Sequence, residues 1–283
     1  MAKVCPICKY SINHIVFKEF NIDILRCVRC GHIFSSYDID QHYDKYFDQT
    51  NLLCSPGSNW WWNEAHKAIY NDFCHKFIVG KSGKLLDVGC GLGYFVKMVY
   101  DYDSWEVFGY EISQEAVDFA VKMGLKNVFC GRVETSSFME KQFDIITLWD
   151  VIEHIPEPDP ILSYLSSLLK DDGILFIYTP NARIQLLKAK IKKLLRGMKP
   201  GVHYMEAKDH INNYQMSTLT IILKRNRFSN VEFIQIRPIQ GVSGSRNQFL
   251  VAMKNLWFYI FALLFRITFG HINLNNLAVI ARK

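Results

Sequence analysis

The sequence predicts an α/β fold around a parallel sheet, preceded by a small cysteine-containing unit. Residues 85–94 change from an apolar run to spaced glycines and then to a helical pattern, and a second apolar run over 106–111 ends in an acid. Strands that alternate with helices are typical of parallel sheets, which bind ligands at the carboxyl ends of their strands. Four cysteines also lie in two close pairs within the first 30 residues. A chain of 283 residues that is 49% hydrophobic can hold one such domain and a small appendage.

The N-terminal unit contains two short cysteine hooks separated by eighteen residues. This spacing is typical of a four-cysteine zinc site. A segment of about 40 residues is too small to fold by apolar burial alone, so a metal would supply the missing stability. We therefore expect a zinc ribbon over residues 1–37, with a disulfide or a chance spacing as the alternative. Its ligands would be Cys5, Cys8, Cys27 and Cys30, and with four protein ligands the zinc would be structural.

Residues 38–81 differ from the ribbon in being both aromatic and polar. They include the triplet Trp60–Trp62 and a helix-like pattern through Ala65, Ile69 and Phe73. We expect a helical cap and linker here, followed by the main domain over 82–283. An alternative is that the tryptophans join the ribbon to the core.

The glycine-rich segment predicts a nucleotide-type cofactor site. Glycines let a ligand approach the backbone, and the turn leaves amide N–H groups at the positive end of the next helix. Asp87, at the end of the preceding strand, favours a cofactor that carries an amino group and positive charge. A spaced-glycine loop can also be a plain turn. The candidate loop residues are Gly89, Cys90, Gly91, Gly93 and Tyr94, with Cys90 in a packing role.

The second strand strengthens this interpretation. It ends at Glu111, at about the ~20-residue offset expected for a carboxylate that binds ribose hydroxyls. A solvated charge at a strand end is the alternative.

Four segments in this order resemble the motifs of class I S-adenosylmethionine-dependent methyltransferases. They are Leu85–Tyr94, Tyr110–Ser113, Phe143–His154 and Leu169–Asn181. The resemblance covers about residues 84–283 and is closest to the ubiquinone-type subgroup, which methylates small molecules and sugars. It implies a Rossmann-like seven-stranded sheet with one antiparallel strand, S-adenosylmethionine as cofactor and methyl transfer as the activity.

The resemblance also implies the cofactor contacts. Besides Asp87 and the glycine loop these are Glu111, Ile112, Val133, Trp149 and Asp150. One departure concerns adenine, because Arg132 follows Cys130-Gly131 where the subgroup usually has an acid. The adenine contact is left open between the Val133 backbone and Arg132. Relatives often take a tyrosine from the segment before the domain, which here points to Tyr43 or Tyr46.

Two histidines are candidate catalytic residues. His210 lies in the substrate insert, about 182–216, before a helix predicted near Ser217. A histidine can take the proton of an attacking hydroxyl, so His210 is the expected general base for O-methylation of a sugar, glycan or lipid-linked acceptor. His154, expected at the start of the helix after the fourth strand, is a base, a ligand or a hydrogen-bonding support. His203 and Tyr204 are lesser candidates.

Two further segments bear on partners. Residues 183–199 contain seven basic residues, no acid, and apolar residues at helical spacing. Such a helix suits an anionic membrane surface, a phosphorylated substrate, or plain packing with a solvated cationic face. The ten apolar residues Leu256–Phe265 are too few for the ~20 that a transmembrane helix needs. One interpretation is a buried helix that joins strands at 231–237 and 277–282. The other is a helix with surplus apolar surface, which would contact a membrane peripherally, through 183–199 and 256–269, or form a homodimer.

Composition leaves two other interpretations open. The formal charge of +6 and the ribbon suit an RNA methyltransferase, although the basic residues concentrate on a helix with an apolar back. The second interpretation is a non-catalytic cofactor-binding module.

The remaining cysteines are scattered and the chain begins without a cleavable apolar signal. Both features favour the cytoplasm, including the inner face of the membrane.

Overall fold

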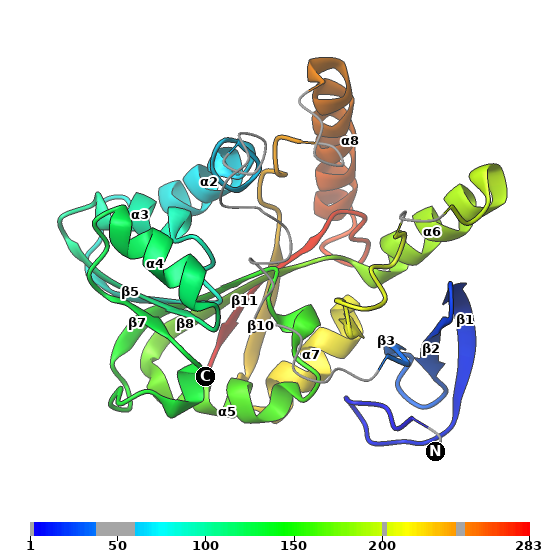
Figure 1. The fold of residues 1–283 in the computed structure, drawn as a ribbon, viewed down its shortest axis with the longest axis horizontal. Coiled ribbons are helices and arrows are strands. Elements are labelled where there is room, and N and C mark those ends of the chain that lie inside the picture. The colour runs from blue at the N-terminus through cyan, green and yellow to red at the C-terminus, as the bar shows by residue number, and fades with distance from the viewer. Residues whose placement is uncertain (1–2, 38–59, 200–202, 242–246) are drawn as a thin grey trace.

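The computed structural model describes residues 3–37, 60–199, 203–241 and 247–283 (Figure 1). Its main body is a seven-stranded sheet with the order β10-β11-β8-β7-β4-β5-β6. The bounds are β4 (Gly83–Val88), β5 (Trp105–Glu111), β6 (Val128–Cys130), β7 (Phe143–Trp149), β8 (Leu169–Thr179), β10 (Asn230–Ile234) and β11 (Leu277–Arg282). β11 runs antiparallel to both of its neighbours, whereas the strands from β8 to β6 are mutually parallel. The predicted sheet with one reversed strand is therefore confirmed.

Helices cover both faces of this sheet (Figure 1). One face carries α2 (Lys67–Phe77), α3 (Tyr94–Tyr100) and α4 (Gln114–Lys122), preceded by the short π-helix Trp60–Ala65. The other carries α5 (Pro158–Leu168) and α7 (Met216–Arg225). Each face has its own buried core, with Phe73, Phe95 and Phe176 on the first and Leu162, Leu219 and Phe228 on the second. Burial on both faces explains why the strands read as apolar runs.

The N-terminal unit is a second, four-stranded sheet. It contains β1 (Asn13–Glu19), β2 (Ile22–Cys27) and β3 (Ile33–Ser35), and its order is β1-β2-β3-β9. The fourth strand, β9 (Asn212–Asn213), comes from the insert near His210, which the sequence analysis did not anticipate. The ribbon is thus joined to the main domain by strand pairing. Of the predicted cap, Tyr43 and Tyr46 lie outside the described residues.

Two helices project from the body on the same side (Figure 1). α6 (Ala182–Arg196) confirms the helix expected near 183–199, and α8 (Gln248–Ile267) contains the apolar run 256–265. The conclusion that this run is too short to cross a membrane was wrong, because the helix has twenty residues and by length and composition could do so. The expectation of a buried connecting helix was also wrong. α8 does join β10 to β11, but Phe258 is its one buried residue.

Candidate active site

The glycine loop follows β4 and is held in conformations that favour glycine. Gly89, Gly91 and Gly93 have φ angles of 71°, 52° and 79°. A side chain at Gly89 would come within 2.5 Å of Val151, and one at Gly93 within 2.9 Å of Ala120 and Leu125. The loop backbone therefore packs closely on its neighbours, and only glycine meets both the conformational and the spatial requirement.

Two buried carboxylates lie at the ends of neighbouring strands beside this loop. The Thr147 hydroxyl donates to Asp87 Oδ1 at 2.6 Å. Glu111 Oε2 accepts from the Gly91 amide at 2.9 Å, and its Oε1 accepts from the Ser113 amide at 3.0 Å. Burial, with the charge of Glu111 as a lesser cause, raises the pKa of Asp87 to about 8. Within the described ranges neither acid has an ion pair, so the pair suits a ligand that brings positive charge and hydroxyl groups.

The other predicted cofactor residues lie around this pair. Ile112, directly after β5, is 36% exposed, and Tyr94 is half-buried at the start of α3. Val133 is buried in a 3-10 turn, whereas its neighbour Arg132 is exposed. Cys90 is buried, and its Sγ would lie 2.8 Å from a Cβ added at Gly109, consistent with a packing role.

Trp149 belongs to an aromatic cluster. Its indole ring contacts the rings of Tyr70, Phe73, Phe95, Phe176 and Tyr178 at centroid distances of 4.7 to 5.9 Å. Its buried Nε1 has no hydrogen-bond partner among the described residues. Trp149 therefore forms part of the wall between the sheet and α2.

Asp150 follows β7 directly and has a left-handed backbone, with φ of 50°. Burial, helped by the charge of Glu206 and opposed by that of Lys254, raises its pKa to about 7. The pair Glu153-His154 lies in the 3-10 turn Ile152–His154 and not at the start of the following helix, which corrects the sequence expectation. The reason is local, because Pro156 and Pro158 disfavour helical backbone at the residues before them.

The structure brings the two candidate histidines together. The His154 and His210 rings meet edge to face at 71°, with centroids 5.0 Å apart. His154 Nδ1 donates to the Asp209 carbonyl at 2.9 Å, and His210 Nε2 lies 3.1 Å from Glu206 Oε2. Burial lowers the pKa of both rings to about 4, and each is therefore neutral near pH 7.

Glu153 completes this histidine cluster. Thr179 Oγ1 donates to its Oε2 at 2.9 Å, and its buried Oε1 has no partner in the described part of the chain. Glu153, His154 and His210 each offer one ligand atom within 4.8 Å of the others. The cluster can accept a proton through a neutral imidazole, and its atoms also match the preferences of a divalent cation.

The segment that carries His210 is fastened to the ribbon through Glu19, which the sequence analysis missed. Glu19 is 1% exposed, and its carboxylate accepts from the amides of Tyr204, Met205 (2.9 Å) and Ala207 (2.7 Å). The sequence weakly indicated its burial. Glu19 lies two positions after Phe17 in β1, so both side chains point to the buried face of the strand.

Further bonds join the same two parts. Ser35 Oγ donates to the Ala207 carbonyl at 2.5 Å, and His32 Nε2 lies 2.9 Å from Asn212 Oδ1. The ribbon therefore shapes one wall of the histidine cluster.

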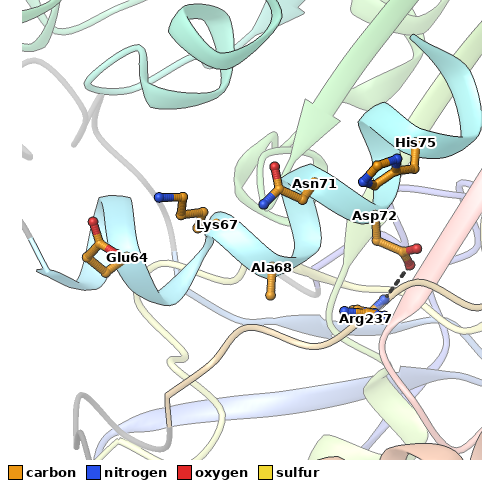
Figure 2. Close-up of a pocket in the computed structure, with 7 residues that line it drawn as sticks. All are labelled: Glu64, Lys67, Ala68, Asn71, Asp72, His75 and Arg237. Atoms are coloured by element: carbon orange, nitrogen blue, oxygen red, sulfur yellow. Dashed lines mark hydrogen bonds between the residues drawn. The ribbon is translucent and has the colours of Figure 1, made fainter. Parts of the chain in front are cut away.

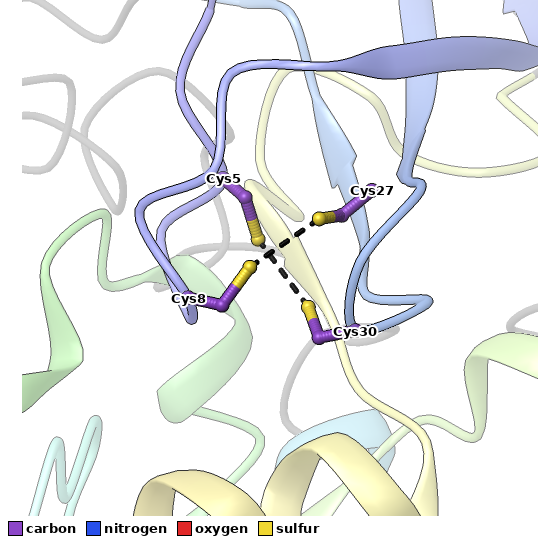
Figure 3. A group of neighbouring side chains, drawn as sticks. All are labelled: Cys5, Cys8, Cys27 and Cys30. Carbon is purple, nitrogen blue, oxygen red and sulfur yellow. Dashed lines mark hydrogen bonds between the residues drawn. The ribbon is translucent and has the colours of Figure 1, made fainter.

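The four N-terminal cysteines converge as predicted (Figure 3). Cys5 and Cys30 have sulfurs 3.6 Å apart, those of Cys8 and Cys27 are 3.4 Å apart, and all four lie within 4.8 Å of one another. Sulfurs bound tetrahedrally at ~2.3 Å from zinc would be roughly 3.8 Å apart, so the cluster has the size of a zinc site.

A surface groove of about 400 Å³ lies elsewhere, between α2 and the segment after β10 (Figure 2). The Arg237 amide donates to Asp72 Oδ2 at 2.9 Å across it. Its lining residues are Glu64, Lys67, Ala68, Asn71, Asp72, His75 and Arg237. They include none of the cofactor or histidine-cluster residues, so the groove is separate from the candidate active site.

Known proteins similar to this chain include methyltransferases. Residues 61–232 match a family described as "Methyltransferase domain". The chain is 26% identical over 192 residues to a ubiquinone biosynthesis O-methyltransferase of Haemophilus ducreyi, a match that covers 60% of the chain and 78% of the relative. A protein of the same name from Coxiella burnetii is 31% identical over 134 residues, 43% of the chain and 57% of that relative.

Solved structures show the same fold. The PH0226 protein of Pyrococcus horikoshii aligns with a TM-score of 0.54 at 16% identity, over 85% of this chain and all (100%) of that one. The family match covers more than half of the chain, from the residues before α2 to β10. It includes the glycine loop, both buried acids and the histidine cluster. The chain belongs to the methyltransferase-domain family and is an S-adenosylmethionine-dependent methyltransferase.

Proposed function

We propose that the protein methylates a hydroxyl oxygen of a sugar, glycan or lipid-linked acceptor, and that His210 takes the hydroxyl proton. The observation that carries this proposal is the neutral, buried His210 held against Glu206. The two relatives described above are named as O-methyltransferases, which supports oxygen as the methylated atom.

The cofactor fits the strand-end acids. Asp87 would face its charged amino-acid portion, and Glu111 would accept from its ribose hydroxyls once released from the Gly91 amide. Ile112, Val133 and the loop from Gly89 to Tyr94 would surround the rest. When bound, S-adenosylmethionine supplies a methyl group already activated by a sulfonium, so the protein's main tasks are alignment and exclusion of water.

His210 is arranged to accept a proton at one defined nitrogen. Because Glu206 is an acceptor, Nε2 of His210 carries the hydrogen and donates it to the carboxylate at 3.1 Å. The second nitrogen, Nδ1, lies 3.5 Å from Gln185 Nε2 and is the proton-accepting position. As the hydroxyl oxygen bonds to the methyl carbon, the carbon–sulfur bond would break and leave a neutral thioether. The hydroxyl proton would move to Nδ1, and Glu206 would stabilise the resulting imidazolium.

Cofactor binding should depend on pH through Asp87. With its pKa raised to about 8, this acid is mostly protonated at pH 6, and a bound cation favours the ionised form. Affinity for S-adenosylmethionine should therefore increase with pH between 6 and 8, by up to about tenfold per unit. Calorimetry in buffers of different ionisation enthalpy should detect proton release near pH 7. Asp87→Asn should abolish that release, and a wild type that releases no proton would exclude this role.

We also propose that the four cysteines bind one structural zinc ion. Zinc would replace the thiol protons, including that of Cys5, whose pKa burial raises to about 11. Elemental analysis should find about one zinc per chain, and Cys27→Ser should reduce it severalfold or more. Cys130→Ser is the matched control, because this exposed cysteine lies outside the cluster. Equal zinc content in wild type and Cys27→Ser would exclude the site.

For location we propose the cytoplasm, at the inner face of the membrane. A methyl-transfer assay tests the acceptor. The protein is given labelled S-adenosylmethionine and a lysate of the source cell, and the label is then measured in the lipid, glycan and RNA fractions. Label in lipid or glycan is the expected result, and it should be absent with a Gly91→Trp variant, whose side chain would fill the cofactor loop. Label confined to RNA would contradict the proposal and favour RNA as the substrate.

A further inference from the structure

α8 presents a continuous apolar stripe to solvent. Its residues are spaced alternately by four and three positions, which places them on one face of the helix. They are Phe249, Met253, Leu256, Ile260, Leu263 and Ile267, with exposed fractions from 37% to 71%. The helix contains no acidic residue. An exposed apolar stripe of this length indicates a contact surface.

The opposite face of α8 is bonded to the body of the protein. Lys254 Nζ donates to the carbonyls of Ile239 and Gly241, each at 2.8 Å. Asn255 Nδ2 donates to Gln240 Oε1 at 2.9 Å. If α8 crossed a bilayer, these polar groups would enter the hydrocarbon together with the segment that they bind, at a large free-energy cost. The bonds therefore favour a helix that lies along a surface over one that crosses a membrane.

α6 adds cations close to α8. Residues 183–199 carry seven lysines and arginines and no acid, and Leu194 and Leu195 near the end of α6 are 86% and 75% exposed. Both helices project away from the sheet on one side (Figure 1). At their bases, Asn181, the N-cap of α6, donates to the carbonyls of Asn273 and Asn275, which follow α8. The pKa of Lys254 is lowered to about 8 by burial and, to a lesser extent, by the nearby charge of Lys188 in α6.

We propose that the outer face of α8 and the basic, leucine-tipped face of α6 form one docking surface for an anionic lipid bilayer. Apolar side chains would enter the interface while the cations face the lipid headgroups. A second copy of this chain is the weaker occupant, because it would bring an identical set of cations against α6. The surface does not depend on the identity of the acceptor.

This docking would place the candidate active site beside the membrane. Gln185 of α6 contacts His210, and Lys254 of α8 acts electrostatically on Asp150. Both helices thus carry residues close to the candidate active site. An acceptor anchored in a bilayer beside them could reach the cluster, in agreement with the lipid-linked acceptors of the proposed function.

Vesicle co-sedimentation of the full chain tests the proposal. The probes are phosphatidylcholine vesicles with about 30 mol% phosphatidylglycerol and vesicles of phosphatidylcholine alone. The wild type should bind the anionic vesicles, more weakly as salt increases. Leu256→Glu with Ile260→Glu should lower the partition coefficient by about 10-fold or more, since two exposed apolar side chains become charged. Met139→Glu is the matched control, because Met139 is 74% exposed on a loop before β7.

A charge-reversed variant on α6, Lys190→Glu with Arg196→Glu, should lose the preference for anionic vesicles. Each variant should bind S-adenosylhomocysteine as the wild type does, which separates failure of docking from failure of the fold or of the cofactor site. Wild type that stays in the supernatant, or an α8 variant that partitions like wild type, would contradict the proposal. A wild-type dimer in sedimentation velocity that the α8 substitutions dissociate, without vesicle binding, would also overturn it and assign the face to self-association.

Discussion

His210→Ala should reduce methyl transfer by about 100-fold or more and leave cofactor affinity unchanged. The substitution removes the nitrogen that accepts the hydroxyl proton, whereas the acids that face the cofactor, Asp87 and Glu111, keep their partners. Turnover measured with the labelled methyl group, together with calorimetry of S-adenosylhomocysteine, separates the two effects.

His203→Ala is the control for this experiment. His203 belongs to the same insert, its side chain is 45% exposed, and its Nδ1 lies 3.9 Å from Glu19. It should retain most of the activity. Normal turnover in His210→Ala with a large loss in His203→Ala would transfer the base role to His203 and exclude the mechanism that pairs His210 with Glu206.

Glu19→Ala should destabilise the protein and loosen the segment that holds Glu206 and His210. The substitution leaves three amides without their acceptor, the buried ones of Met205 and Ala207 and the partly buried one of Tyr204. At about 1–3 kcal/mol for each unsatisfied group, the free energy of unfolding should fall by roughly 3 kcal/mol or more. Denaturant unfolding measures this loss, and hydrogen exchange should increase at residues 204–213.

Glu232→Ala is the matched control, since it also removes a strand glutamate. Glu232 is exposed on β10 and lies 3.9 Å from Arg282, so its loss should change stability by about 0.5 kcal/mol or less. Glu19→Gln should recover part of the loss because its amide oxygen can still accept. Equal unfolding free energies for Glu19→Ala and Glu232→Ala would show that Glu19 does not fasten this segment.

The sequence predicted features whose physical cause is local. A strand that ends in an acid, a glycine turn and a helix all lie within a few residues, so Asp87, the glycine loop and Glu111 could be placed before the structure was known. The cysteine hooks were equally local, because each pair closes within one turn. The sheet with one reversed strand came from the resemblance of four such segments taken together.

Features that depend on contacts between distant segments could not be predicted. β9 has two residues and becomes a strand only because Ile33 and Phe34 pair with it. Glu19 seemed an ordinary acid, since its amide partners lie about 185 positions away. The length of α8 was misjudged because Gln248, Lys254 and Asn255 interrupt the apolar pattern. Lys254 and Asn255 are satisfied by the segment after β10.

Sharing a sheet between the ribbon and β9 sets an order for folding during synthesis. His32 and Asn212 are 180 positions apart, so the ribbon sheet stays incomplete until most of the chain has left the ribosome. Closing so long a loop is slow and entropically costly. The cysteine hooks, only about twenty residues apart, can close much earlier. Metal capture would then precede docking, and a chain cut before Asn212 would keep β3 as an open strand edge prone to aggregation.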